Sequence, residues 1–224
     1  RDAEFKGNAS HTQVVRYLSF SVTDGVKAGV DKIERQETDN TFDLYGNVAA
    51  QDTYIHVTID SVEKLSKRIY TANEEINIAT GDSRTQKVTT YATDDSGVIL
   101  KDAEGNDLPA TYQVLTNRKF DSRHSVTNQN IYTYTSPLDT AQAVSIQEIR
   151  SSGFLSSGVA RNQVVAELDK DGKSYEVKFI TNSDVSVQGY VGTSDITRYE
   201  SLTREIAETD TVLTLKSLIV PANY

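Results

Sequence analysis

The chain has 224 residues and a formal net charge of −9, with 37% apolar and 25% charged residues. This negative charge opposes binding to nucleic acid or anionic lipid through the overall field, and the patterned runs of apolar residues argue against disorder throughout the chain. Cysteine is absent, which excludes disulfides, zinc thiolate sites and cysteine nucleophiles.

The residue types favour strands over helices. The chain contains 25 Thr, 22 Val and 12 Tyr against 13 Leu, and branched or aromatic side chains suit a pleated, half-buried surface. No stretch reaches the roughly 18 apolar residues that a membrane helix needs. Methionine is absent even at position 1, so we expect that a leader was removed or that further residues precede Arg1.

The first part of the chain is predicted to begin with an arm. Residues 1–11 show no hydrophobic period, whereas residues 12–22 alternate between apolar and polar side chains and predict a strand. The next segment, residues 23–35, places three apolar residues at helical spacing behind a capping position. This spacing predicts a helix, although two glycines weaken it.

Short strands separated by turns are predicted through the middle of the chain. The strands are expected at 41–50, 53–60, 75–80, 85–93, 97–102, 111–117 and 130–135. Residues 61–72 fit either a helix face or a strand, and both interpretations stay open. Turn-forming residues occupy 94–97 and 104–107, and the polar segment 117–130 predicts an exposed loop.

The last part of the chain contains the clearest hairpin and the clearest helix. Residues 140–152 fit a helix that stops at a glycine, and a strand at 143–149 fits nearly as well. Strands are expected at 161–168, 174–181 and 184–192. The first two of these flank the turn-forming residues 169–173, and this arrangement predicts a hairpin. Residues 194–208 carry a cap and an apolar face at helical spacing, which predicts a helix.

The segment 211–220 predicts a strand that is apolar on both faces. At period two, one face holds Leu213, Leu215 and Ile219, and the other holds Val212, Leu218 and Val220. Such a strand needs cover on both sides. The cover comes either from the interior of the chain's own sheets or from a neighbouring copy, and the pattern does not decide between them.

Together these elements predict a mainly β fold, with sandwich or barrel-like antiparallel sheets and one to three short helices. No shift in composition and no linker divides the chain. We therefore expect an N-terminal arm over 1–11 and a single β-rich domain over 12–224.

Motifs for catalysis and for metal binding are weak. The three histidines lie at no metal-ligand spacing, and His56, inside a predicted strand, is interpreted as structural. Asp169-x-Asp171-Gly172 resembles the start of a calcium loop, but Ile180 stands where that loop needs a glutamate. We expect no enzyme activity, no catalytic residue and no cofactor. The alternative to the absence of a cofactor is a calcium ion bound by carboxylates from separate loops.

A strand-rich chain without a catalytic motif is typical of a structural subunit. We expect self-assembly into a homopolymer, as a virion coat (capsid) or tail protein or as an extracellular filament or surface-layer protein. Copies of the same chain are the expected partners, joined through strand edges and terminal segments. The residues expected at the assembly interface are Phe5, Leu213, Leu215, Leu218, Ile219 and Val220.

Two other functions stay open. A secreted binding module, such as an adhesin or a carbohydrate-binding β-sandwich, needs an exposed aromatic platform, for which Tyr132 and Tyr134 are the candidates. A hydrolase on a β scaffold would use paired carboxylates, which the sequence does not single out.

Overall fold

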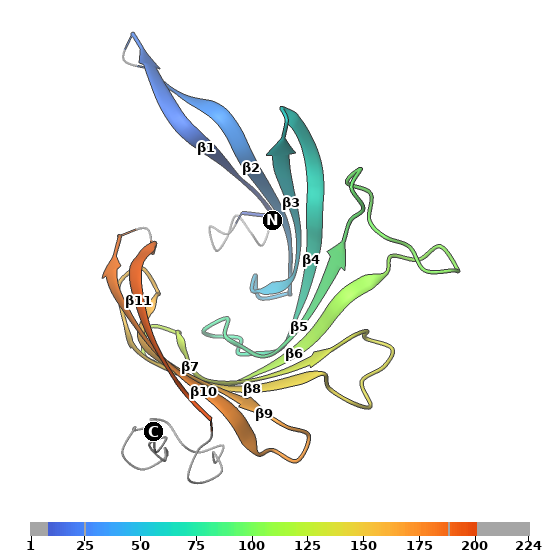
Figure 1. The fold of residues 1–224 in the computed structure, drawn as a ribbon, viewed down its shortest axis with the longest axis vertical. Helices are drawn as coiled ribbons and strands as arrows, with labels where there is room; N and C mark the ends of the chain where they lie inside the picture. The colour runs from blue at the N-terminus through green and yellow to red at the C-terminus, as the bar shows by residue number, and fades with distance from the viewer. Residues whose placement is uncertain (1–8, 25, 188, 201–224) are drawn as a thin grey trace. The chain divides into compact units, whose positions relative to one another are not determined.

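The described chain consists of strands and turns. A computed structural model describes residues 9–24, 26–187 and 189–200, and these ranges contain no helix (Figure 1). The strands are β1 (His11–Thr23), β2 (Val26–Phe42), β3 (Val48–Ile59), β4 (Val62–Ile76), β5 (Ser83–Ala92), β6 (Pro109–Phe120), β7 (Val126–Tyr134), β8 (Ser145–Phe154), β9 (Ala160–Leu168), β10 (Ser174–Val185) and β11 (Val191–Tyr199). Each strand neighbours the next in sequence. The prediction of a mainly β chain is confirmed.

Short helices are not found in the described part of the chain, which also holds no helix able to cross a membrane. The helix predicted at 23–35 is wrong, because these residues lie mostly in β2. The helix predicted at 194–208 is wrong over Ser194–Tyr199, which belong to β11, and its residues 201–208 lie outside the described residues. The two ambiguous segments, 61–72 and 140–152, contribute to β4 and β8. Helical spacing of a few apolar residues arises by chance in strands, and ladder hydrogen bonds to a neighbour outweigh a weak local preference.

The described strands form one antiparallel sheet, so the sandwich or barrel stays a prediction. The contacts of the chain divide it into two compact units, which are described separately. The N-terminal unit comprises residues 1–112 and 135–138, and the C-terminal unit comprises residues 113–134 and 139–224. The single domain over 12–224 also stays a prediction, because a division by contacts does not decide whether the units fold independently.

Five turns share one geometry, in which an aspartate begins the turn and its Oδ1 atom accepts the backbone N–H groups two and four residues later. They begin at Asp43, Asp94, Asp102, Asp121 and Asp169. The fourth residue has a positive φ, and it is glycine except at His124, where φ is 64°. This Asp-capped turn with a left-handed residue reverses an antiparallel pair tightly.

The turns confirm the hairpin predicted around 169–173 and correct the loop predicted at 117–130. The prediction of a long loop is wrong, because β6 ends at Phe120, β7 begins at Val126, and only a short turn separates them. Polar residues continue through both strands because they hydrogen-bond within the sheet. Gln129 donates to Asn117 over 2.7 Å, for example, between β7 and β6.

Four of the predicted strands are turns or irregular segments over part or all of their length. A turn interrupts three of them: it begins at residue 43 in 41–50, at residue 77 in 75–80 and at residue 186 in 184–192. Residues 97–102 make only isolated bridges. The apolar residues that suggested these strands project from turns, and Leu44 and Val187 are 91% and 83% exposed.

In the N-terminal unit, one row of side chains crosses five strands in register. The directly opposed residues from β1 to β5 are Gln13, Glu37, Tyr54, Arg68 and Tyr91. The Arg68 guanidinium lies 5.6 Å from the ring centre of Tyr54 and 5.2 Å from that of Tyr91. Directly opposed side chains are the main stabilising pairs of a sheet, and an arginine between two aromatic rings adds a cation–π attraction.

A charge cluster beside this row connects β2 to β4. Arg35 donates from Nε to Glu63 over 2.9 Å, and Lys32 also contacts the Glu63 carboxylate. These hydrogen bonds, the one from Arg35 first, lower the pKa of Glu63 from 4.5 to about 2. Ionised Glu63 therefore stabilises the folded chain above its unfolded-state pKa, and this contribution is lost as the pH falls through about 2.

We expect the Glu63→Gln variant to show a weaker loss of stability than the parent chain between pH 4.5 and pH 2. The difference should be on the order of 1 kcal/mol, since a quarter-exposed pair is partly screened by solvent. Urea unfolding at a series of pH values measures it. Parallel pH profiles for the two proteins would contradict the assignment.

The C-terminal unit combines a small apolar core with a buried ionic cluster. Val164, Ala166 and Val177 form the core on β9 and β10. Against it pack Phe179 and Tyr199, whose rings meet edge to face at 5.7 Å. Among the described residues of the whole chain, buried apolar side chains are fewer than buried polar ones, so hydrogen-bonded networks must supply part of the stability.

Three strands contribute to the ionic cluster. The Glu148 carboxylate on β8 accepts hydrogen bonds from Arg118 Nη1 and Arg150 Nη1, each at 2.8 Å, and from Asn130 Nδ2 at 2.9 Å. The Arg150 side chain is 2% exposed and that of Glu148 is 7% exposed. Two guanidiniums thus share one buried carboxylate.

Candidate assembly interface

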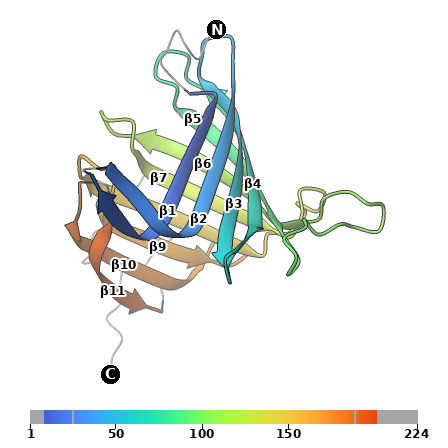
Figure 2. The same ribbon diagram turned by 90° about the horizontal axis from the view of Figure 1, so that it is seen from above.

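The β1–β2 hairpin extends beyond the strand that follows it. The pairing of β2 with β3 begins at Glu34, whereas the pairing of β1 with β2 continues to Thr23 and Val26. Figures 1 and 2 show β1 and β2 side by side, and Figure 1 shows their far end running on past β3. We call residues 17–24 and 26–32 the hairpin arm. Within the described chain, the strands of the arm pair only with each other.

Both faces of the hairpin arm expose apolar side chains. The register places Ser19 opposite Val30 and Thr23 opposite Val26, so the apolar residues of β2 share one face with hydroxyl residues of β1. Leu18 and Val22 of β1 lie on the other face, because successive strand residues alternate. Leu18, Val22 and Val26 are 72%, 63% and 67% exposed. An isolated two-stranded ribbon is marginally stable in water, so this arrangement favours contact with a neighbour.

A close contact between an aromatic ring and a glycine supports the base of the arm. A Cβ atom placed on Gly29 would lie 2.3 Å from the Tyr17 ring. The ring therefore occupies the space that any other residue at position 29 would need. An aromatic ring over a strand glycine compensates for the missing side chain and helps to fix the register.

The outer strands β1 and β11 differ in how they protect their free edges. Natural edge strands avoid association through charges, proline, bulges or short length. In the described structure β1 spans 13 residues and contains no proline or lysine, and its exposed Arg16 and one irregularity precede residues 17–23, which carry no charge. β11 is shorter and exposes Asp195 and Arg198 along its length. Of these two edges, β1 is therefore the better surface for pairing with another chain.

The residues that the sequence predicts at the interface lie outside the described residues. They are Phe5, Leu213, Leu215, Leu218, Ile219 and Val220, and their role stays a prediction. Within the predicted arm 1–11, the carbonyl groups of Ala9 and Ser10 accept hydrogen bonds from Asn40, and His11 begins β1. Sequence reasoning missed the hairpin arm because residues 26, 30 and 33 suggested a helix, although residues 26, 28 and 30 also alternate as in a strand.

The other sequence-based candidates have local structural roles. Asp169 Oδ1 accepts the N–H groups of Asp171 and Lys173 at 2.9 Å each, which is the turn geometry described above. The described residues contain no group of three potential metal-ligating side chains. His56 lies in β3, where its Nδ1 atom is buried and makes no hydrogen bond within the described chain. The interpretation of His56 as a hydrogen-bonded structural histidine is therefore not confirmed.

The two tyrosines suggested for an aromatic platform form a stacked pair, and their role in binding stays a prediction. The rings of Tyr132 and Tyr134 on β7 are 6.4 Å apart between centres and inclined by 14°. Tyr132 is 37% exposed. The pair is brought together simply because residues two apart on a strand share a face.

The sequence matches no known protein family, and no curated protein matches it significantly.

Proposed function

We propose that the chain is a non-enzymatic structural subunit that assembles with copies of itself, in a virion coat or tail or in an extracellular filament or surface layer. The observation that carries the proposal is the hairpin arm, with exposed apolar side chains on both faces. Exposed apolar surface of this kind is typical of interaction sites, and a free strand edge adds main-chain hydrogen bonds.

Charge favours a second copy as the partner. The whole chain carries a net charge of −9, which repels another copy at most surfaces. The arm sequence, in contrast, is neutral, because Asp24 and Asp31 balance Lys27 and Lys32. Two arms can therefore approach each other without a net repulsion between them.

The edge of β1 supports a specific geometry for this contact. A two-fold axis perpendicular to the sheet would pair β1 of one copy with β1 of another as antiparallel strands. The sheet would then continue from one copy into the next, and the neighbour's side chains would lie beside the exposed rows of the arm and bury part of them.

Charge substitutions on the arm test the proposal. The parent chain should form dimers or larger particles, as measured by sedimentation velocity and negative-stain microscopy. The double variants Leu18→Lys/Val22→Lys and Val26→Lys/Val30→Lys each change one face of the arm. Each should weaken association by about a hundredfold, since burying two such side chains contributes roughly 3 kcal/mol or more.

The matched control is Leu44→Lys/Leu138→Lys, which changes two apolar residues that are 91% and 96% exposed outside the arm. This control should assemble like the parent chain. Circular dichroism should show a folded protein in all variants, because the arm contributes no strand pairing to the rest of the sheet. A monomeric parent chain, or folded arm variants that assemble normally, would refute the proposal.

A further inference from the structure

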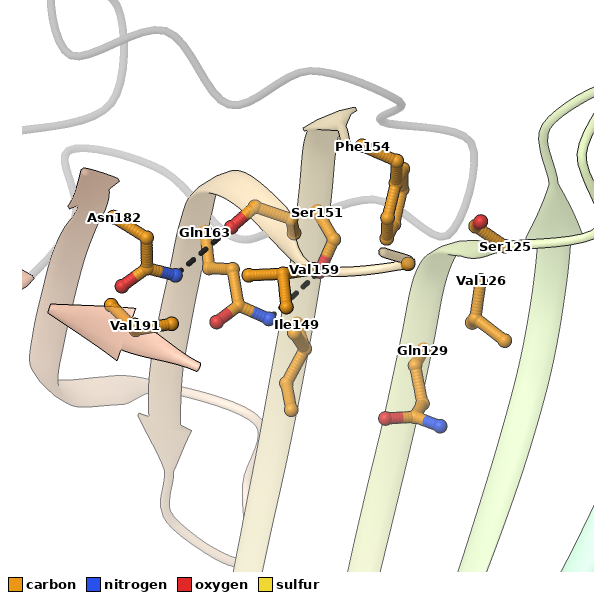
Figure 3. A pocket seen from close by; sticks show the side chains of 12 residues that line it. Ser125, Val126, Gln129, Ile149, Ser151, Phe154, Val159, Gln163, Asn182 and Val191 are labelled. Atoms are coloured by element: carbon orange, nitrogen blue, oxygen red, sulfur yellow. Dashed lines mark hydrogen bonds between the residues drawn. The ribbon is translucent and has the colours of Figure 1, made fainter. Parts of the chain in front are cut away.

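A hollow in the C-terminal unit is lined entirely by uncharged residues. Its volume is about 530 Å³, within the usual range of small-molecule sites. Figure 3 shows Asn182 and Val191 on one side and Ser125, Val126 and Gln129 on the other. The remaining lining residues are Ile149, Ser151, Phe154, Gly158, Val159, Ala160 and Gln163.

Hydrogen bonds to neighbouring groups orient the amide side chains of the hollow. Gln129 donates to Asn117 over 2.7 Å, Gln163 donates to Ser151 over 3.1 Å, and Asn182 donates to the backbone carbonyl of Ala160 over 2.9 Å. The two glutamine Oε1 atoms accept no hydrogen bond from the described residues. Each glutamine therefore keeps a free acceptor and a second N–H for a ligand.

The apolar part of the lining complements these polar groups. Figure 3 shows Phe154 between Ser151 and Ser125, and Val159 and Ile149 close to Gln163. An aromatic ring presents a negative face, which attracts the weakly positive C–H groups of a sugar ring. The hollow thus offers both an apolar ring surface and amides that can pair with hydroxyl groups.

We infer that this hollow binds a neutral carbohydrate. A charged ligand would lose hydration on entry without meeting an opposite charge, because none of the twelve lining residues is ionisable. A neutral sugar unit presents hydroxyl donors and acceptors to Gln129 and Gln163, and a C–H face to Phe154. Oriented amides lower the entropic cost of this recognition. The inference is independent of self-assembly, because it rests on residues outside the hairpin arm.

Titration with simple saccharides tests the inference. The probes are glucose, galactose, N-acetylglucosamine and their disaccharides, with glucuronate and sialyllactose as charged comparisons. Saturation-transfer NMR and calorimetry should detect binding of at least one neutral saccharide to the full chain. The Leu18→Lys/Val22→Lys variant should bind that saccharide equally well, which separates this result from the test of assembly.

Two substitutions then locate the binding. Phe154→Leu removes the ring face but keeps an apolar side chain, and Gln163→Leu removes one amide; each should weaken binding by about threefold to tenfold. Gln86→Leu is the matched control, because this amide lies on β5 and donates to Asn73 over 2.9 Å, outside the hollow. Failure of every neutral saccharide to bind, a preference for the charged ones, or full binding by both hollow variants would overturn the inference.

Discussion

Replacing Glu148 with glutamine is expected to lower the free energy of unfolding by about 3–5 kcal/mol, the usual cost of breaking a buried ion pair. The glutamine amide places an N–H₂ group where one carboxylate oxygen accepted hydrogen bonds from arginine. Arg118 and Arg150 then lose the negative charge that they share, with Arg150 only 2% exposed. Urea denaturation followed by circular dichroism measures the loss.

The control for Glu148→Gln is an exposed ion pair in the same unit. Lys170 and Asp171 are each 71% exposed, so Asp171→Asn should change stability by less than about 0.5 kcal/mol. A double variant, Glu148→Leu/Arg150→Leu, should be more stable than Glu148→Gln alone, because it removes the most buried charge, that of Arg150, together with its partner and leaves only the more exposed Arg118 without the carboxylate. Unchanged stability in Glu148→Gln would show that the cluster is hydrated in solution.

Replacing Arg68 with lysine is expected to cost about 2–3 kcal/mol although the charge is kept. Arg68 donates from Nε and Nη2 to the two oxygens of Asp52 at 2.8 and 2.7 Å, and from Nη1 to Asp107 at 3.0 Å. These contacts, the hydrogen bond with Asp52 first, raise the pKa of Arg68. A lysine ammonium cannot reproduce the planar, two-pronged contact or the stacking between Tyr54 and Tyr91.

Arg84→Lys is the matched control for this substitution. Arg84 is 68% exposed and lies 3.7 Å from Glu75, so its replacement should have almost no effect on stability. Arg68→Lys should also speed proteolysis within residues 93–108, because Asp107 fixes the end of that segment to β4 through Arg68. Equal stability for the two variants would mean that charge alone accounts for the role of Arg68.

The positions of several turns could be predicted from the sequence because a turn depends on neighbouring residues. An aspartate followed three residues later by glycine supplies both the capping carboxylate and the left-handed backbone, as at Asp94 and Asp169. The turn at Asp121 was missed because His124 replaces the glycine. Strand-forming composition likewise predicted the mainly β character, although not the absence of helices from the described residues, since residue types report local backbone preference.

The faces and pairings of the strands required the tertiary structure. Nothing in the segment 117–130 shows that its polar side chains belong to a hydrogen-bonded sheet, because their partners lie on other strands. Glu148 and Arg118 are 30 residues apart and meet only through the strand order.

By itself, therefore, the sequence determined the strand-rich class and the turns at 94–97, 104–107 and 169–173, because these follow from contacts between residues close along the chain. Only the tertiary structure decided that residues 26–33 are a strand and that the hairpin arm exposes apolar side chains on both faces. It also decided that uncharged side chains from five strands and their turns line one hollow. The physical reason is that strand pairing and burial depend on partners distant in sequence, which local pattern does not specify.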